Sequence, residues 1–137
     1  MKLDCVLTST NQRERYIEMI PIFIKYWKKL YPNVDIKIIV IGKIPDKYKE
    51  FNEYLIEYDS MNMNKAFVSQ YIRLLYPALL NYQNGVLITD IDDLPLNKYF
   101  FTENIKHIDD DMWVNYYFFD GTDPVSYTHL TLPTTPY

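Results

Sequence analysis

The sequence has very little glycine, a single cysteine and no long apolar run. Only 3 of its 137 residues are glycine, which excludes collagen-like chains and flexible linkers because both need far more of it. The lone Cys5 has no disulfide partner in the chain and is expected to be a small buried thiol in a reducing compartment. Nowhere do about 18 apolar residues follow one another, and Asp4 interrupts the N-terminus too early for a signal peptide. The sequence therefore predicts a soluble, cytoplasmic protein without a transmembrane segment.

Positive charge is also scarce. The chain has 14 lysines and arginines against 18 aspartates and glutamates, and its net charge is -4 at pH 7. No basic block is long enough to follow a phosphate backbone, so no nucleic-acid partner is expected. A hydrophobic content of 48% over this length can supply one core, which points to one domain or part of one.

The last residues differ abruptly from the rest. From Val125 onward no Asp, Glu, Lys or Arg occurs. The segment resembles the in-frame translation of a transposon-end adaptor used in DNA-library preparation, read as GTC TCT TAT ACA CAT CTG ACG CTG CCG ACG. We therefore expect a truncated gene product, whose natural sequence occupies residues 1–124, and a non-native tail at residues 125–137. A genuine Thr- and Pro-rich terminus is the alternative.

Strand and helix patterns alternate before this tail. Apolar runs predict strands at residues 3–8, 36–41, 54–58, 86–89 and 112–119. Helical spacing occurs at residues 16–31, 45–52 and 64–82, and the polar segment 96–108 is compatible with a helix. Residues 9–11 are expected to form a turn and helix cap, and Pro21 is a candidate kink. This order predicts an α/β fold with a mostly parallel, Rossmann-like sheet and helices on both faces.

Two aspartates, Asp90 and Asp92, directly follow the most apolar of these strands. Ligands of open parallel sheets bind beyond the carboxyl ends of the strands. Two carboxylates one residue apart can face the same point there, which suits Mg²⁺ or Mn²⁺ and leaves open positions for phosphate oxygens. The pair therefore predicts a site for a cation and a diphosphate, with a solvated turn as the alternative.

The segment around these aspartates resembles a known family. Residues 85–96, GVLITDIDDLPL, resemble the strand-DxD element of glycosyltransferases with the GT-A fold. The helix before it is similar to the tyrosine-x-arginine helix of the family 8 galactosyl- and glucosyltransferases, and Arg73 lies 17 residues before Asp90, as in that branch. The resemblance implies a nucleotide-sugar-binding domain over residues 1–124 and a Mn²⁺ or Mg²⁺ cofactor. It implies hexosyl transfer from a UDP-linked donor to an unidentified glycan, lipid or protein.

The resemblance also implies roles for single residues. Asp92 would bind the metal directly, and Asp90 would bind the metal or the donor ribose. The other donor-binding candidates are polar residues near strand ends and on the preceding helix: Thr8, Ser9, Thr10, Lys65, Arg73 and Asp93. The structural alternatives are an ion pair between Arg73 and an aspartate, a solvated Lys65 and helix capping by the threonines. No catalytic residue is assigned.

Two other functions are compatible with the motif. Phosphatases of the haloacid-dehalogenase type also place Asp-x-Asp after an apolar strand, with one aspartate as nucleophile and the other as acid or base. In that family the motif ordinarily follows the first strand, whereas three strand patterns precede it here. A non-catalytic fragment that binds a nucleotide or metal is the third possibility.

Overall fold

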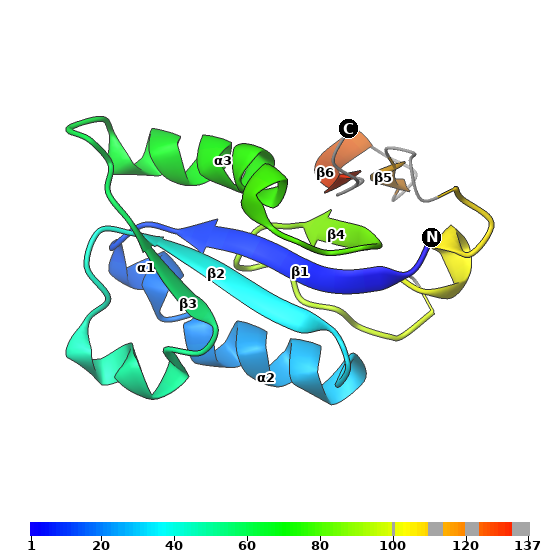
Figure 1. The fold of residues 1–137 in the computed structure, drawn as a ribbon, viewed down its shortest axis with the longest axis horizontal. Coiled ribbons are helices and arrows are strands. Elements are labelled where there is room, and N and C mark those ends of the chain that lie inside the picture. The colour runs from blue at the N-terminus through cyan, green and yellow to red at the C-terminus, as the bar shows by residue number, and fades with distance from the viewer. Residues whose placement is uncertain (100, 110–113, 120–123, 133–137) are drawn as a thin grey trace.

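One sheet of six strands forms the centre of the molecule. The computed structural model describes residues 1–99, 101–109, 114–119 and 124–132 (Figure 1). The strands lie in the order β3-β2-β1-β4-β6-β5. Their bounds are Leu3–Thr10 for β1, Asp35–Ile41 for β2, Leu55–Tyr58 for β3, Gly85–Ile88 for β4, Val114–Phe119 for β5 and Pro124–Leu132 for β6. The first four strands pair in parallel, whereas β6 is antiparallel to both of its neighbours.

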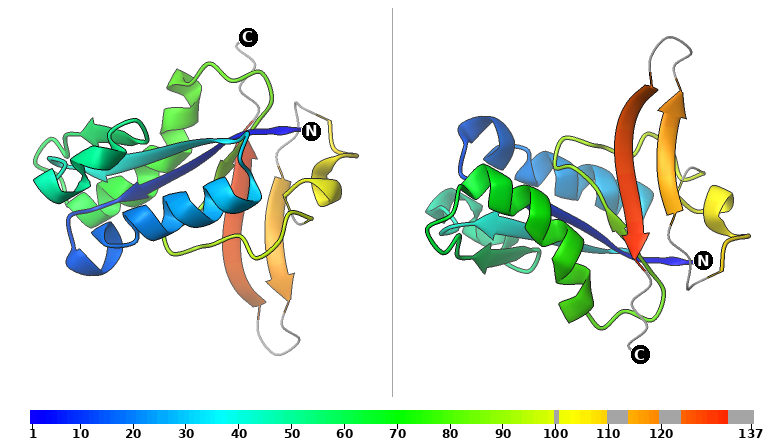
Figure 2. Two further views of the ribbon diagram at one scale, coloured as in Figure 1. Left: turned by 90° about the horizontal axis from the view of Figure 1, so that it is seen from below. Right: turned by 90° about the horizontal axis from the view of Figure 1, so that it is seen from above.

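Helices cover both faces of this sheet, as the sequence predicts. The α-helices are α1 (Glu14–Ile17), α2 (Ile20–Leu30) and α3 (Lys65–Leu75), and the 3-10 helices are η1 (Asp46–Phe51), η2 (Tyr76–Leu79) and η3 (Glu103–Ile105). Figure 2 shows α2 in front of the sheet from one side and α3 in front of it from the other. In the described part of the chain, no helix has both the length and the apolar character needed to cross a bilayer. The parallel strands and the helices on both faces confirm the predicted α/β fold class.

The first helical region is two helices rather than one. The chain leaves α1 after Ile17 and begins α2 at Ile20, so that Pro21 lies in the first turn of α2. Proline is favourable there because the first amides of a helix have no partner within the helix. Pro21 therefore lies at the start of a helix and does not kink one, so the predicted kink is wrong.

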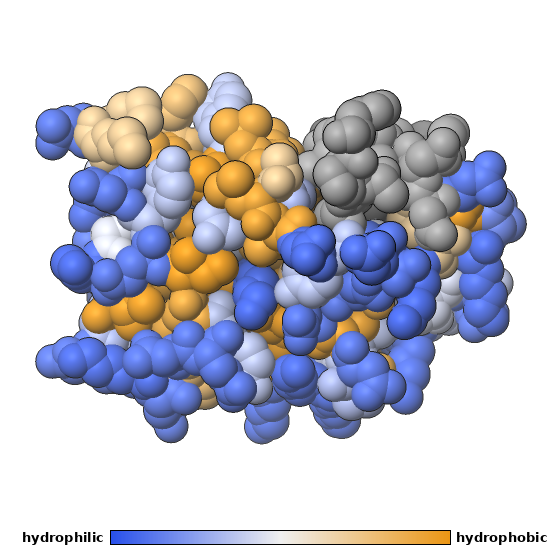
Figure 3. Space-filling view, viewed as in Figure 1, coloured by the Kyte–Doolittle hydropathy of each residue, from blue (hydrophilic) through white to orange (hydrophobic). Residues whose placement is uncertain are grey.

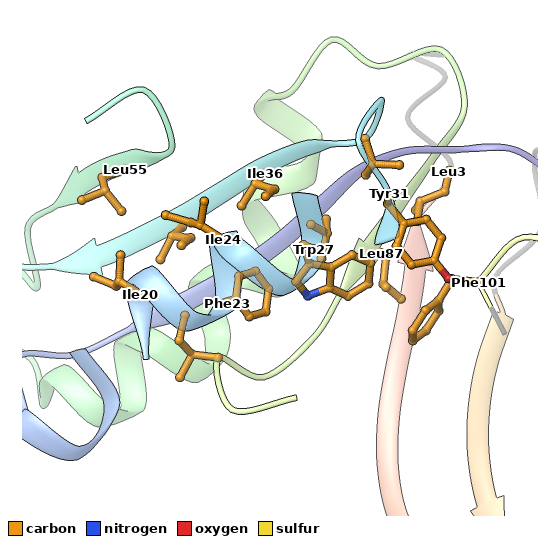
Figure 4. Close-up of a cluster of buried hydrophobic side chains, with 14 of the residues drawn as sticks. Leu3, Ile20, Phe23, Ile24, Trp27, Tyr31, Ile36, Leu55, Leu87 and Phe101 are labelled. Carbon is orange, nitrogen blue, oxygen red and sulfur yellow. The ribbon is translucent and has the colours of Figure 1, made fainter. Parts of the chain in front are cut away.

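Aromatic packing joins α2 to the segment that follows β4. The ring of Trp27 lies 5.9 Å from that of Phe23, 5.2 Å from Tyr31 and 5.4 Å from Phe101, measured between centroids (Figure 4). The Tyr31 hydroxyl also donates to the carbonyl oxygens of Asn97 and Lys98, both at 3.0 Å. Phe101 and these two carbonyls belong to the segment that follows β4, so this cluster fixes the segment against α2.

A second core lies under α3. Val68 and Ile72 of this helix pack with Cys5, Leu7 and other strand residues. Cys5 is fully buried, and this burial raises the pKa of its thiol to about 12. Figure 3 shows apolar side chains at the surface in the region of α3, where Leu75 and Leu79 are exposed.

Two other predicted elements differ in the structure, and the predicted start of a third lies outside the described residues. The helix predicted over residues 64–82 ends at Leu75 and continues as η2, because Pro77 has no N–H to donate and disfavours helical geometry in the residue before it. Among the described residues of the segment 96–108, the short η3 is the only helix. The strand predicted at residues 112–119 is β5, and residues 112 and 113 lie outside the described residues.

Candidate functional site at the carboxyl edge of the sheet

The carboxyl ends of β1 and β4 lie side by side. Leu7 pairs with Ile88, and the Thr89 N–H donates to the Leu7 carbonyl oxygen at 3.1 Å. The residues that follow on both strands therefore meet at one edge. A cavity of about 310 Å³ lies at this edge, and its lining includes Ser9, Thr10, Arg73, Asp90 and Asp92.

A tight turn brings both aspartates to this cavity. The Asp93 N–H donates to the Asp90 carbonyl oxygen at 3.1 Å, and the Thr89 hydroxyl donates to Asp93 Oδ2 at 3.0 Å. Ile91, between the two aspartates, is buried in the core beneath α2. Both Asp90 and Asp92 line the cavity. Asp93 does not line it and instead closes the turn.

Arg73 of α3 forms an ion pair with one aspartate. Its Nη1 contacts Asp90 Oδ1 and also donates to the Thr89 carbonyl oxygen at 3.2 Å. The structural alternative for Arg73, an ion pair with an aspartate, is therefore present. Among the described residues no side chain pairs with Asp92, which is exposed. The two carboxylates thus differ, because Asp90 is held in place while Asp92 is available to a ligand.

The three candidates on β1 have different surroundings. The strand continues through Thr10 instead of ending at Thr8, so the turn expected at residues 9–11 is wrong. β-branched threonines are compatible with this extension. The Ser9 hydroxyl donates to the Ser69 carbonyl oxygen and the Thr10 hydroxyl to that of Asn11.

Thr8 is not part of the cavity lining. It is fully buried, and its hydroxyl has no hydrogen-bond partner among the described residues. Helix capping by the threonines is also wrong, because the cap position of α1 is Arg13 and no side chain caps that helix. Ser9 and Thr10 therefore remain site candidates by position, whereas Thr8 lies apart.

Lys65 lies in a neighbouring cavity of about 340 Å³. It is exposed, and its Nζ donates to Gln12 Oε1 at 2.6 Å. The residue before it, Asn64, caps α3 by accepting from the N–H groups of Ala66 and Phe67 at 2.9 and 3.3 Å. Lys65 is therefore close to the aspartates' cavity without lining it.

Sequence reasoning missed six lining residues of the first cavity, of which four are polar: Arg13, Tyr16, Ser69 and Gln70. Arg13 and Tyr16 follow β1 directly, in a connection of the kind that lines ligand sites of parallel sheets. Gln70 precedes Arg73 by three residues on α3, so the two share one helix face. Position directly after a strand could therefore have identified Arg13 and Tyr16, and helical spacing from Arg73 could have identified Gln70.

The acidic pair is suited to a hard cation but does not enclose one. Among the residues that the structure describes, no group of three or more His, Cys, Asp and Glu side chains lies close enough to hold a metal ion. Asp90 and Asp92 present carboxylate oxygens, the ligands that Mg²⁺ prefers, and Mg²⁺ usually keeps water and substrate phosphate as its other ligands. The chemistry of the donor set therefore fits a cation shared with a ligand.

Comparisons with known proteins find similarity of fold. No family model matches the chain, and no curated protein matches its sequence. The apo form of the glycosyltransferase GlyE of Streptococcus pneumoniae TIGR4 aligns with a TM-score of 0.63 at 14% identity, over 97% of this chain and 34% of GlyE. The galactosyltransferase LgtC, in complex with donor and acceptor sugar analogs, aligns with a TM-score of 0.55 at 14% identity, over 95% of this chain and 58% of LgtC. The chain thus has the Rossmann-like fold seen in these proteins and spans less than two thirds of either.

Proposed function

We propose that this chain is the donor-binding part of a glycosyltransferase that transfers a sugar from a nucleotide-diphosphate sugar. The observation that carries the proposal is the convergence of Asp90 and Asp92 on one cavity beyond the carboxyl end of β4. Similarity in fold to GlyE and LgtC supports it. The haloacid-dehalogenase alternative has no such support.

In this proposal the acidic pair binds Mn²⁺ or Mg²⁺ together with the donor diphosphate. The chemistry that such a cation supplies is neutralisation of the charge that develops on the leaving diphosphate. Asp92 is the direct ligand, because its carboxylate has no partner among the described side chains. Asp90 contributes from a fixed orientation, because Arg73 holds it.

The neighbouring polar residues would bind and orient the donor. Ser9 and Thr10 line the cavity, and each hydroxyl oxygen can still accept a hydrogen bond while it donates to a carbonyl. Arg73 has further N–H groups that can donate to a sugar hydroxyl or a phosphate. Asp93 would contribute indirectly, because its carboxylate accepts from the Thr89 hydroxyl and so stabilises the turn that carries Asp90 and Asp92.

The finer predictions from the sequence belong to this proposal. They are a UDP-linked donor, hexosyl transfer, an acceptor among glycans, lipids and proteins, and a cytoplasmic location. LgtC has been crystallised with donor and acceptor sugar analogs. UDP-sugars are the first donors to test here, because a UDP-linked donor is the expectation from the sequence.

The domain boundaries are also part of the proposal. We assign the nucleotide-sugar-binding domain to residues 1–124 and an adaptor-derived tail to residues 125–137. The tail includes most of β6, which pairs with β4 through Leu132, Thr131 and Leu130. Such pairing is compatible with an adaptor origin, because an open strand edge accepts extended chains through main-chain groups. The reading frame of the source gene beyond Pro124 tests this directly, and a natural frame that encodes the same tail would disprove the adaptor origin.

Ligand-observed NMR with a panel of small molecules tests the function. We expect UDP-sugars to bind in the presence of Mg²⁺, and to lose binding when the cation is chelated. Phosphomonoesters should neither bind comparably nor be hydrolysed. Hydrolysis of p-nitrophenyl phosphate that Asp92→Asn abolishes would instead support the phosphatase. Absence of any nucleotide-sugar binding would refute the proposal.

A further inference from the structure

A second cavity adjoins the first, and its charged lining residues are both positive, whereas the first is lined by two arginines and two aspartates. Arg13 and Ala66 line both cavities, so the two meet at these residues. The other residues of the second cavity are Asn11, Gln12, Asn64 and Lys65. Two of the six carry positive charge, three carry amides and none of these described lining residues is acidic. We call this space the basic cavity, and we propose that it binds a phosphate-type oxyanion of the substrate.

Charge around the two cavities supports an anion at this place. Of the three cationic side chains that line them, only Arg73 forms an ion pair within the described residues. Arg13 pairs with no described carboxylate, and Lys65 contacts only the neutral Gln12. Two cations that line one cavity without a carboxylate partner favour binding of a group that carries one or two negative charges.

Lys65 is held toward the cavity rather than left free. Gln12 Nε2 donates to the Lys43 carbonyl oxygen at 2.8 Å, and Gln12 Oε1 accepts from Lys65 Nζ at 2.6 Å. Both polar atoms of the Gln12 side-chain amide are therefore hydrogen-bonded, one to Lys43 and the other to Lys65. Because the ammonium group has three N–H bonds, Lys65 can donate to an oxyanion without losing Gln12.

Asn11 adds an unused donor at the same place. It is buried, and its Oδ1 accepts from the Arg13 N–H at 2.9 Å. No described residue accepts a hydrogen bond from its Nδ2, which can therefore donate to an oxyanion in the basic cavity. The helix N–H groups of α3 do not supply this role, because the Asn64 side chain already accepts from two of them.

This inference rests on the proposed function and adds to it a second binding site for a negatively charged group of the substrate. The oxyanion has two possible sources, the donor's own diphosphate or a phosphate group on a separate acceptor. The first source requires the donor to extend from Asp92 past Arg13 into the basic cavity. The second requires a phosphate to bind while the first cavity is already filled.

Calorimetric titration distinguishes these sources. In the first titration, UDP with Mn²⁺ is added to the wild-type chain and to the Arg13→Ala and Lys65→Ala variants. In the second, inorganic phosphate is added to the same three proteins after they have been loaded with UDP. If the donor supplies the oxyanion, each variant should bind UDP about tenfold more weakly, as expected for loss of one charged hydrogen bond. If an acceptor supplies it, UDP affinity should be unchanged, while phosphate binds the loaded wild type and not the variants.

Matched variants control for loss of charge and for folding. Lys25→Ala removes one exposed positive charge outside both cavities and should behave as wild type in both titrations. Arg13→Lys should retain part of the affinity, because it keeps the charge but not the planar fork. Thermal unfolding midpoints close to that of wild type establish that the variants fold.

The possible failures are distinct. If wild type does not bind UDP with Mn²⁺, the proposed function and this inference both fail. If wild type binds UDP but Arg13→Ala and Lys65→Ala match it in both titrations, only the basic cavity's role is overturned.

Discussion

At the residue scale, two aspartates that look equivalent in the sequence have different surroundings. Asp90 forms an ion pair with Arg73, whereas Asp92 faces the cavity without a described partner. The motif and the strand before it were sufficient to predict that both reach one site. They did not predict which aspartate is paired, because that depends on where α3 places Arg73. Arg13 was missed because no fixed spacing links it to the aspartates.

Loss of the Arg73 side chain should have a small effect on stability. The Asp90 side chain is 47% exposed, so solvent screens its ion pair with Arg73. We expect Arg73→Gln to lower the free energy of unfolding by about 1 kcal/mol in urea titration at low salt. Asp90→Asn should cost a similar amount, and the double variant little more than either. Fully additive costs would show that the two side chains do not interact.

The buried thiol should make stability depend on alkaline pH. The pKa of Cys5 rises from 9.0 to about 12 on burial. Above about pH 9 the unfolded chain loses the thiol proton, whereas the folded chain keeps it up to about pH 12. The stability that Cys5 contributes is therefore fully present below about pH 9 and is lost as the pH rises toward 12. The unfolding free energy of wild type relative to Cys5→Ala should therefore fall by up to about 1.4 kcal/mol per pH unit. An unchanged difference between pH 8 and pH 11 would contradict this account.

At the element scale, periodicity located the strands and helices but not all of their ends. The apolar runs of β2 and β4 and the spacing of α3 were sufficient to predict those elements. The split between α1 and α2 and the end of α3 depend on Pro21 and Pro77, whose effect is on backbone hydrogen bonding rather than on hydrophobic pattern. The extension of β1 through Thr10 depends on pairing with Val40 of β2, which is a tertiary contact.

The two faces of α3 should differ in their contribution to stability. Ile72 is 8% exposed and packs on the sheet, whereas Leu75 is 67% exposed. We expect Ile72→Ala to cost about 2–4 kcal/mol and Leu75→Ala to change stability by no more than about 0.5 kcal/mol. Chemical denaturation of the two variants measures this, with Leu75→Ala as the matched control. Equal costs would mean that α3 packs through a different face.

Gly42 should be required for the contact between Gln12 and Lys65. Its φ is +111°, and a Cβ at this position would lie 2.9 Å from the Gln12 side chain. We expect Gly42→Ala to cost about 1–2 kcal/mol in urea titration, from backbone strain together with the clash. In a Gln12→Ala background the cost should be smaller, because only the strain remains. The same cost in both backgrounds would show that the clash is absent.

At the scale of the whole molecule, the order of elements predicted a parallel sheet with helices on both faces. Strand order and the position of β6 were not predictable, because they depend on pairings between distant segments. The two adjoining cavities arise in the same way, from β1, α1, α3 and the turn after β4 meeting at one edge. The sequence named the carboxylate pair, Arg73 and Lys65 as candidates, whereas the fold adds Arg13, which lines both cavities.

The most direct test of the central claim is calorimetric binding of UDP with and without Mn²⁺ to wild type, Asp92→Asn and Asp46→Asn. Asp46 is a highly exposed aspartate on η1 that pairs with Lys49, so its variant controls for loss of one negative charge. We predict Mn²⁺-dependent UDP binding by wild type and Asp46→Asn, and at least about tenfold weaker binding by Asp92→Asn. Binding that is independent of Mn²⁺, or equal in wild type and Asp92→Asn, would contradict the claim that the acidic pair holds a cation for a diphosphate.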